Sequence, residues 1–533
     1  MESGLNSPPE LEGMTLARMM AKRVEEAPNR VALAGMSAAG VETRITYAQL
    51  DWGARRFASV LAEREVAVGD RVGIMLGNDA VIEFGQALMG VHQLGAVFVP
   101  VNARFALEEV IYVVNKAGIR ALVVADKLGE AVAGARQRMP TLDTLVTVGP
   151  GRVDGCLSWD ELAVRTRVDR TIESRLEPFD MAEILFTSGT TANPKGAIHT
   201  HSSAVHSSYS MAGAFALTRE DVLQTFMPLF TSGGVRALTC ALWAGCTIVF
   251  DPALDVDAVI ERMDRERTTR YVGTSAFYIF LLDRASQRAI DVSNITAFMF
   301  GGSPTTAEVI RRLDEGFPGI DLRNMFAPTE TGPAGTLINR PEILNRPTSV
   351  GTPWALVEVK CVDDDDNTVP AGERGEVCTR GPCIMSGYYG DPELSAEALK
   401  GGWHHTGDIG VIDEDGYLSI VDRKKDMVIR GGHNIASLEV EQVLSQHAAV
   451  AEAAVVGVPH PKLGEDIQAF LLLRSGESTT PEAVRAFCDG KLADYKIPRK
   501  IAIVETLPRG PLGKVLKSAL REIAVEMNRQ TVA

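Results

Sequence analysis

Residues 186–196 form a dense run of hydroxyl, glycine and lysine residues, Phe186-Thr-Ser-Gly-Thr-Thr-Ala-Asn-Pro-Lys-Gly196, directly after an apolar stretch. Hydroxyl groups, backbone N–H groups and one cation are together what a polyphosphate chain requires of its binding loop. The run differs from the Walker pattern, because Pro194 precedes Lys195 and Gly196 follows it. It therefore predicts a phosphate-binding loop that does not open a helix in the usual way, with a polar surface loop as the alternative.

Two further segments place carboxylates beside residues that suit a nucleotide. In Met325-Phe-Ala-Pro-Thr-Glu-Thr-Gly332, the aromatic ring could stack on a base and Glu330 could bind Mg²⁺, a cation that prefers oxygen ligands. A loop with a core phenylalanine is the alternative interpretation of this segment. Gly402-Trp-His-His-Thr-Gly-Asp408 ends in a carboxylate that could accept hydrogen bonds from both hydroxyls of a ribose.

The fourth segment, Pro508-Arg-Gly-Pro-Leu-Gly-Lys514, presents a lysine on a loop framed by glycine and proline. Such a lysine could stabilise developing oxyanion charge, and a surface lysine before the last helix is the alternative. The chain has a formal net charge of −15, which argues against a nucleic-acid partner. Between Arg485 and Arg521, however, nine Lys or Arg residues stand against three Asp or Glu residues, so positive charge gathers around Lys514.

The elements that must position these segments alternate between short apolar runs and stretches of helical period. Runs that predict strands occupy residues 71–75, 96–100, 121–125, 181–186, 270–272 and 297–300, and residues 80–94 have the period of a helix. Strand and helix in turn indicate a layered α/β domain with a mostly parallel sheet, which binds ligands at the loops after its strands. Residues 357–420 have a β-rich pattern, and the segment from about residue 422 to the end is typical of a small α+β domain.

Taken together and in this order, the four segments resemble the adenylate-forming superfamily of acyl-CoA synthetases, luciferases and peptide-synthetase adenylation domains. The similarity extends from Thr46 to Arg521. It is strongest to stand-alone fatty or aryl acyl-CoA synthetases, through segments 431–435, 439–441, 495–499 and 508–517. The resemblance implies an α/β fold with a large N-terminal domain of layered sheets at 1–424, including a β-rich subdomain at about 350–420. A small mobile α+β lid domain at 425–533 would carry Lys514.

The resemblance also implies a reaction in two steps. A carboxylate attacks ATP to give an acyl adenylate and pyrophosphate, and the thiol of CoA then displaces AMP. Mg²⁺ would be held by Glu330, and Lys514 would be catalytic. Asp408 would bind the ribose hydroxyls, and Arg423 would support the ribose and the phosphates. The other expected ATP ligands lie in the 186–196 segment, directly after the run at 297–300, and in the 325–332 segment: Thr187, Ser188, Gly189, Thr190, Thr191, Lys195, Gly301, Gly302, Ser303, Phe326, Ala327 and Thr329.

In this family the small domain rotates between the two steps, and the resemblance places the hinge at Lys425 and the CoA tunnel at Gly431 and Gly432. The implied acid pocket is small and apolar and has no cation for a second carboxylate, so an apolar acid is expected. Its expected lining residues are Phe230, Thr231, Gly233 and Phe277. The chain departs from the usual family pattern at Ala192, Phe326, Ala327 and Thr231, and the last of these bears on the substrate.

We therefore expect an ATP-dependent carboxylate–CoA ligase acting on a fatty or other apolar acid. An adenylating ligase that loads a carrier protein is one alternative, and a non-catalytic nucleotide or acyl binder is another. The intact Lys195, Glu330, Asp408 and Lys514 disfavour the binder. No signal peptide or membrane span is expected, which suggests a cytoplasmic enzyme with small-molecule partners, and the sequence leaves a homodimer open.

Overall fold

The computed structural model describes residues 7–163, 176–187, 194–302, 305–431, 433–510 and 515–530. The chain divides into two compact units, one of Met1–Val359 with Thr379–His405 and the other of Lys360–Cys378 with Thr406–Ala533. None of the helices in the described ranges is both long and apolar enough to cross a membrane.

The first unit contains a seven-stranded sheet in the order β7-β6-β5-β3-β4-β8-β9 among the described residues. Neighbouring strands run parallel except for β8 and β9, which are antiparallel. The strands are β3 (Arg71–Met75), β4 (Val97–Pro100), β5 (Ile119–Ala125), β6 (Thr144–Val148), β7 (Leu157–Ser158), β8 (Met181–Thr187) and β9 (Lys195–Thr200).

A second sheet of the same unit has the order β16-β15-β14-β13-β12-β10-β11-β1-β2 within the described ranges. Its central strands β1, β10, β11, β12, β13 and β14 are parallel, and the pairs at both ends are antiparallel. The strands are β1 (Val31–Met36), β2 (Glu42–Thr46), β10 (Val222–Thr225), β11 (Thr247–Phe250), β12 (Arg270–Gly273), β13 (Ala297–Gly301), β14 (Asp321–Phe326), β15 (Thr336–Ile338) and β16 (Thr352–Pro353).

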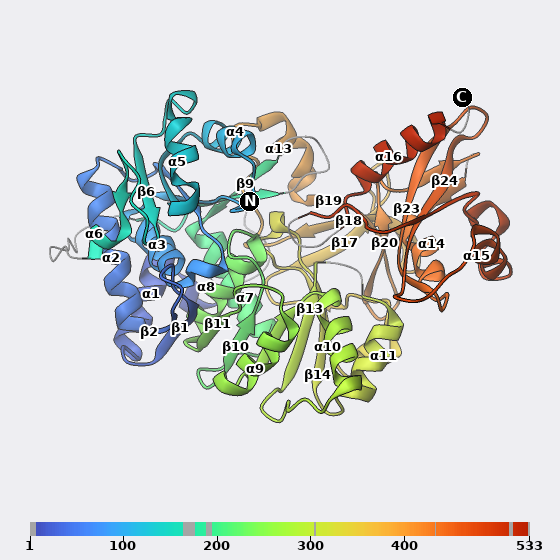
Figure 1. The fold of residues 1–533 in the computed structure, drawn as a ribbon, viewed down its shortest axis with the longest axis horizontal. Coiled ribbons are helices and arrows are strands. Elements are labelled where there is room, and N and C mark those ends of the chain that lie inside the picture. Colours follow the sequence, from blue (N-terminus) through green and yellow to red (C-terminus); the bar gives the residue numbers. More distant parts are fainter. Residues whose placement is uncertain are drawn as a thin grey trace. The chain divides into compact units, whose positions relative to one another are not determined.

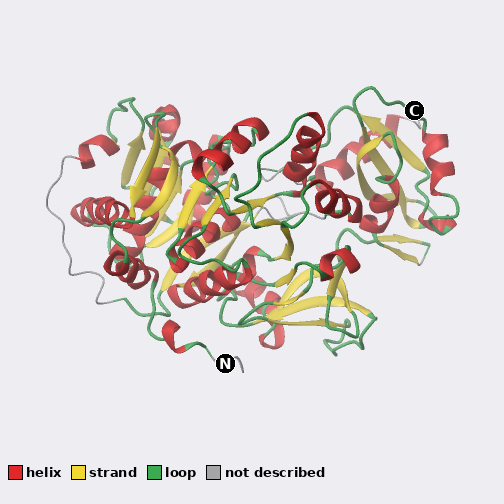
Figure 2. Ribbon diagram, turned by 90° about the horizontal axis from the view of Figure 1, so that it is seen from below, coloured by secondary structure: helices red, strands yellow, loops and turns green. Residues whose placement is uncertain are grey.

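Helices cover the faces of these sheets, as Figure 2 shows. Alternate residues of β5 enter different cores: Ala121 and Val123 face the core that holds α2, α3, α7 and α8, whereas Leu122 and Val124 face the core of α4 and α5. This alternation explains why both faces of the sheet are apolar. The helices of the unit are α1 (Leu16–Glu26), α2 (Tyr47–Glu63), α3 (Val81–Leu94), α4 (Leu107–Ala117), α5 (Asp126–Gly134), α6 (Trp159–Ala163), α7 (His201–Ala214), α8 (Ser232–Ala244), α9 (Val256–Glu266), α10 (Ser275–Gln287), α11 (Ala307–Gly316), α12 (Glu342–Asn345) and α13 (Pro392–Ala398).

The second unit is built on two smaller sheets. The division between the units falls within a sheet of order β17-β18-β19-β20, formed by β17 (Glu358–Val362), β18 (Arg374–Arg380), β19 (His404–Ile412) and β20 (Leu418–Arg423). The other has the order β22-β21-β24-β23, with β25 paired to β24, and it comprises β21 (Val428–Arg430), β22 (His433–Ile435), β23 (Val450–His460), β24 (Gly464–Leu473) and β25 (Lys500–Val504).

Successive residues of β23 again separate two cores. Val455 packs with α14 (Ser437–Leu444) and α15 (Pro481–Cys488), whereas Val456 packs with α16 (Lys517–Gln530). Figure 1 shows these helices beside β23 and β24. The predicted fold class is confirmed: layered α/β sheets form the large unit and an α+β arrangement forms the small one. Residues 406–424 group with the small unit by their contacts. The predicted domain boundary at residue 425 refers to the hinge about which the small domain would rotate, and it stays a prediction.

Candidate active site

The predicted phosphate loop connects two paired antiparallel strands. Thr187 ends β8, Lys195 begins β9, and the two residues are register partners. The hydroxyl of Thr187 also donates to the carbonyl of Lys195 at 3.5 Å. Lys195 therefore starts a strand and not a helix, as its flanking Pro194 and Gly196 predict. The predicted ligands between these two ends, Ser188, Gly189, Thr190 and Thr191, lie outside the described residues, as does Ala192.

A residue that the sequence did not single out, Tyr388, connects Lys195 to Glu330. Its hydroxyl donates to Oε1 of Glu330 at 3.0 Å, and Nζ of Lys195 lies 5.5 Å from the centre of its ring. Burial, together with the neighbouring Glu330 charge, raises the pKa of Tyr388, so the phenol stays protonated and can donate. The spacing of residues gives no signal for this role, because Tyr388 is 58 positions from Glu330.

The backbone around Tyr388 explains how it reaches both groups. Residues 386–389 lie beside β9, with hydrogen bonds of 2.9 Å from Ile198 N to Gly387 O and of 2.8 Å from Tyr389 N to Gly196 O. One residue earlier, Met385 N donates to the carbonyl of Glu330 at 2.8 Å. One short segment thus joins the strand of Lys195 to the turn of Glu330.

Thr329 and Glu330 lie on a single turn of 3₁₀ helix, Thr329–Thr331, which follows β14. The two expected ATP ligands that precede this turn, Phe326 and Ala327, are half-buried, and Phe326 is the last residue of β14. The turn ends at Gly332, whose φ of 69° lies in the left-handed region that glycine adopts without strain. The hydroxyl of Thr329 shares a hydrogen bond of 2.7 Å with Ser232 Oγ.

Gly301 ends the neighbouring strand β13 and is paired with Met325 on β14, and Gly302 follows directly after the strand. A Cβ atom at Gly301 would lie 2.5 Å from Met325 Cγ and 2.7 Å from Met325 O, so a side chain there would displace the start of the 325–332 segment. Gly302 has a φ of 74°. The two glycines therefore lie at the end of β13, where the sequence analysis predicts that the sheet binds its ligand. Ser303 lies outside the described residues.

The predicted acid-pocket residues come from two places in the first unit, the N-terminus of α8 and helix α10. Thr231 is the N-cap of α8: its hydroxyl accepts from Gly234 N at 3.2 Å and donates to Pro228 O at 2.7 Å. Phe230 and Gly233, on either side of this cap, are half-buried. Phe277 on α10 is fully buried and stacks on Tyr271 with ring centres 4.5 Å apart. Thr231 therefore caps helix α8, and Phe277 packs within a buried aromatic cluster.

In the second unit, the two predicted ribose ligands lie next to each other. Asp408 on β19 and Arg423 on β20 are cross-strand partners, and Arg423 Nε donates to Asp408 Oδ1 at 2.9 Å. The Asp408 side chain is only 7% exposed, whereas that of Arg423 is 40% exposed. The exposed Lys425 follows two residues later, and its carbonyl accepts a hydrogen bond of 3.3 Å from Arg521 on α16.

The predicted catalytic lysine, Lys514, lies outside the described residues, as does Gly432 of the predicted CoA tunnel. The ends of the Lys514 loop are held together, because Arg509 and Val515 form a β-bridge and Leu516 N donates to Pro508 O at 2.8 Å. Gly431 is exposed, with a φ of 58°.

Comparison with known proteins covers both units. A model of the AMP-binding enzyme family matches residues 20–389, and a model of the AMP-binding enzyme C-terminal domain matches residues 439–514. The chain is 32% identical to the putative acyl-CoA synthetase YngI of Bacillus subtilis, over 97% of this chain and 98% of the relative. It is also 32% identical to the long-chain-fatty-acid–CoA ligase FadD13 of Mycobacterium tuberculosis, over 90% and 93%. The crystal structure of the anthranilate CoA ligase AuaEII with anthranoyl-AMP matches with a TM-score of 0.87 and 25% identity, over 97% of this chain and 98% of that one.

Proposed function

Because the chain belongs to the AMP-binding enzyme family, we propose that it activates a carboxylic acid with ATP and transfers the acyl group to CoA. The observation that carries the proposal is the similarity to acyl-CoA synthetases across nearly the whole chain, both units included. The chemistry explains the two steps: hydroxide is a poor leaving group from a carboxylate, and AMP is a much better one. The chain is thus an AMP-forming acid–thiol ligase whose acid is to be identified.

For the first step, the segment from Thr187 to Lys195 would bind the β- and γ-phosphates. Thr329 would hold the α-phosphate, and Gly301, Gly302 and Phe326 would line the adenine pocket. The residues fit Mg²⁺, since Glu330 offers a carboxylate that Tyr388 orients through a hydrogen bond of 3.0 Å. Mg²⁺ held there would neutralise negative charge on the phosphate oxygens.

Residues of the smaller unit would take part in the same reaction. The buried carboxylate of Asp408, fixed by Arg423, suits the two ribose hydroxyls. Lys514 would stabilise the charge that develops between the attacking carboxylate and the α-phosphate. A hinge at Lys425 would then withdraw Lys514 and bring Gly431 and Gly432 to the path of the CoA thiol, where the absence of side chains leaves room.

The acid is proposed to be apolar, either a fatty or an aryl acid. Phe230, Thr231, Gly233 and Phe277 would form its pocket, and the group contains no cation that could pair with a second carboxylate. Relatives support both classes, since FadD13 is named for long-chain fatty acids and AuaEII for anthranilate.

A cytoplasmic location is part of the proposal because ATP and CoA are available there. A homodimer also stays a prediction, which analytical ultracentrifugation can test.

Pyrophosphate release with a panel of fatty and aryl acids, with and without CoA, tests the function. We expect acid-dependent release and, with CoA, a thioester detectable by mass spectrometry. An acyl adenylate that transfers only to a carrier protein would support the carrier-loading alternative. Absence of acid-dependent release would support a non-catalytic binder.

Lys514→Ala tests the assignment of roles within the proposed reaction. It is expected to abolish adenylate formation and to leave thioester formation from supplied acyl adenylate largely intact, because the lysine is needed only in the first step. Lys462→Ala, which removes an exposed lysine of the same unit, is the matched control. If Lys514→Ala retains both half-reactions equally, Lys514 does not have the proposed catalytic role.

A further inference from the structure

The core of the first unit contains a charged pair that no part of the proposed reaction uses. Arg236 on α8 and Glu183 on β8 both have fully buried side chains, and Arg236 Nη2 lies 2.7 Å from Glu183 Oε2. The second carboxylate oxygen has no hydrogen-bond partner among the described residues, and His92 Nε2 is 3.8 Å from it. Removing two charges from water is costly even when they are paired, so a buried ion pair is weak evidence for added stability, and its other contacts are relevant.

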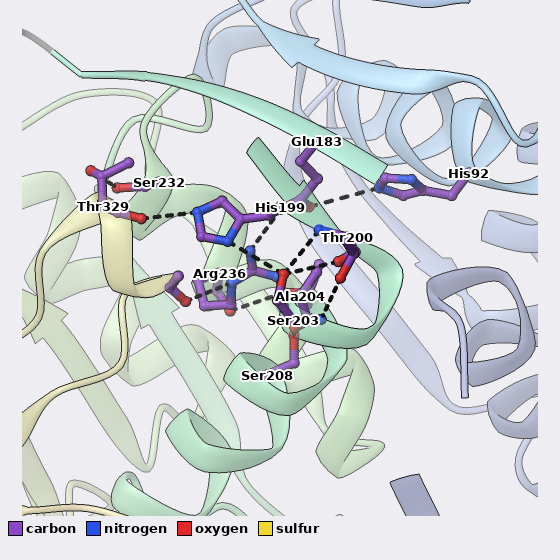
Figure 3. Close-up of polar contacts among 12 residues, drawn as sticks. His92, Glu183, His199, Thr200, Ser203, Ala204, Ser208, Ser232, Arg236 and Thr329 are labelled. Carbon is purple, nitrogen blue, oxygen red and sulfur yellow. Dashed lines mark hydrogen bonds and ion pairs between the residues drawn. The ribbon is translucent and has the colours of Figure 1, made fainter. Parts of the chain in front are cut away.

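The remaining guanidinium hydrogen bonds show what Arg236 holds in place. Nη1 donates to the carbonyl of Ala204 on α7 at 3.1 Å and to Thr239 Oγ1 at 3.2 Å. Nε donates to the carbonyl of Gly332 at 3.2 Å. Figure 3 shows Arg236 between Glu183 and Ala204. Arg236 therefore fixes the residue that ends the Thr329–Thr331 turn.

The other end of this turn is held by His199. The histidine is the register partner of Glu183 on the paired strands β8 and β9, and its Nε2 lies 3.1 Å from the carbonyl of Thr329. Because a carbonyl only accepts, Nε2 must carry the proton. Burial lowers the pKa of His199 to about 3, which keeps the ring neutral, and Nδ1 lies 3.5 Å from Ser203 Oγ.

We propose that His199 and Arg236 are positioning residues for adenylate formation, which fix the Thr329–Gly332 turn through the carbonyls at its two ends. Glu183 in turn holds Arg236. This inference rests on the proposed role of Thr329 and Glu330 toward ATP and Mg²⁺. Catalytic geometry tolerates errors of only about 0.5 Å, so a turn with free carbonyls would present Glu330 less well. Outer residues that orient a metal ligand typically contribute 10- to 100-fold to affinity or activity.

His199→Leu and His199→Gln separate positioning from packing. The leucine removes the N–H donor, whereas the glutamine amide can still donate to Thr329 O. Two quantities report on the turn: the Mg²⁺ concentration for half-maximal pyrophosphate release, and the Kd of ATP measured by calorimetry with Mg²⁺ and with EDTA. We expect His199→Leu to weaken the Mg²⁺-dependent values about 10- to 100-fold and His199→Gln to restore most of the loss.

His206→Gln, at a largely buried histidine of α7 that bonds to Ser7 and Ser202, is the matched control and should keep the wild-type values. Normal Mg²⁺ and ATP parameters in His199→Leu, or equal losses in the leucine and glutamine variants, would overturn the proposal. If the wild-type protein releases no pyrophosphate with any acid, the proposed function has failed instead.

Arg236→Met alone leaves the Glu183 carboxylate buried without its partner and can prevent folding. The double variant Glu183→Leu with Arg236→Met removes both charges and should fold, because apolar replacements of a buried pair are often neutral or stabilising. We expect it to melt within a few degrees of the wild type and still to weaken Mg²⁺-dependent ATP binding about 10-fold or more. A stable double variant with wild-type ATP binding would contradict the role of Arg236.

Discussion

Lowering the pH should reduce the free energy of unfolding of this enzyme, because its core contains histidines that are neutral in the folded state. His199 and His201 are buried, and burial lowers the pKa of His199 to about 3 and that of His201 to about 4. Burial also lowers the pKa of His92, which lies edge-on to His201 with ring centres 5.6 Å apart. In the unfolded chain a histidine has a pKa of about 6.5. Between that value and the folded one, the unfolded state binds more protons than the folded state.

The sign and size of the effect follow by linkage. The contribution of each histidine is fully present above about pH 6.5 and is lost as the pH falls toward the folded pKa. At pH 5, about 1.5 pH units below the unfolded pKa, each histidine costs about 2 kcal/mol. His199 and His201 together then cost about 4 kcal/mol, which is a large share of the 5 to 15 kcal/mol typical of a domain.

The assay is the urea midpoint of unfolding, followed by tryptophan fluorescence at pH 8 and pH 5. His199→Gln removes one titrating group and keeps a donor for Thr329 O, so the drop in midpoint between the two pH values should shrink by roughly 0.5 to 1 M. His201→Phe should reduce the drop similarly, and His433→Gln, at an exposed position, should leave it unchanged. Variants of His199 and His201 that lose as much stability on acidification as the wild type would refute the reasoning.

Substitutions at three positions test other parts of the site. Tyr388→Phe keeps the ring near Lys195 but removes the donor to Glu330, and it should raise the Mg²⁺ concentration for half-maximal pyrophosphate release about 3- to 10-fold. Asp408→Ala removes the proposed ribose acceptor, and we expect the KM for ATP in the same assay to rise about 10- to 100-fold. Thr231→Trp should raise the KM for the acid and not that for ATP, whereas Thr231→Ser keeps the helix cap and should behave like the wild type.

For each of these substitutions, one outcome would contradict the role proposed for the residue. An unchanged Mg²⁺ response in Tyr388→Phe would show that the hydroxyl does not orient Glu330. Asp408→Ala with a normal KM for ATP would remove Asp408 from the ribose site. If Thr231→Trp affects all acids and ATP alike, the cause is loss of the cap and not a filled acid pocket.

The strands and helices that carry the site could be predicted from the sequence because their patterns are local. The run at residues 181–186 predicts a strand, and the structure has β8 at Met181–Thr187. The helix expected at residues 80–94 is α3, Val81–Leu94. The pairing of Asp408 with Arg423 was not predicted, although both were candidate ribose ligands, because register between strands depends on the turn between them.

Local chemistry identifies Thr329 and Glu330 as candidates, since a hydroxyl and a carboxylate beside an aromatic residue suit a nucleotide. Their supports are distant in sequence: Tyr388 is 58 positions from Glu330, Arg236 is 96 from Gly332, and His199 is 130 from Thr329. Each support lies in a segment whose own pattern is that of an ordinary strand, helix or loop. Residues that touch a ligand can be recognised by their chemical type, but residues that hold a backbone carbonyl can be recognised only by position. Transfer of the 325–332 motif into another chain would therefore carry the ligands of the site without the groups that orient them.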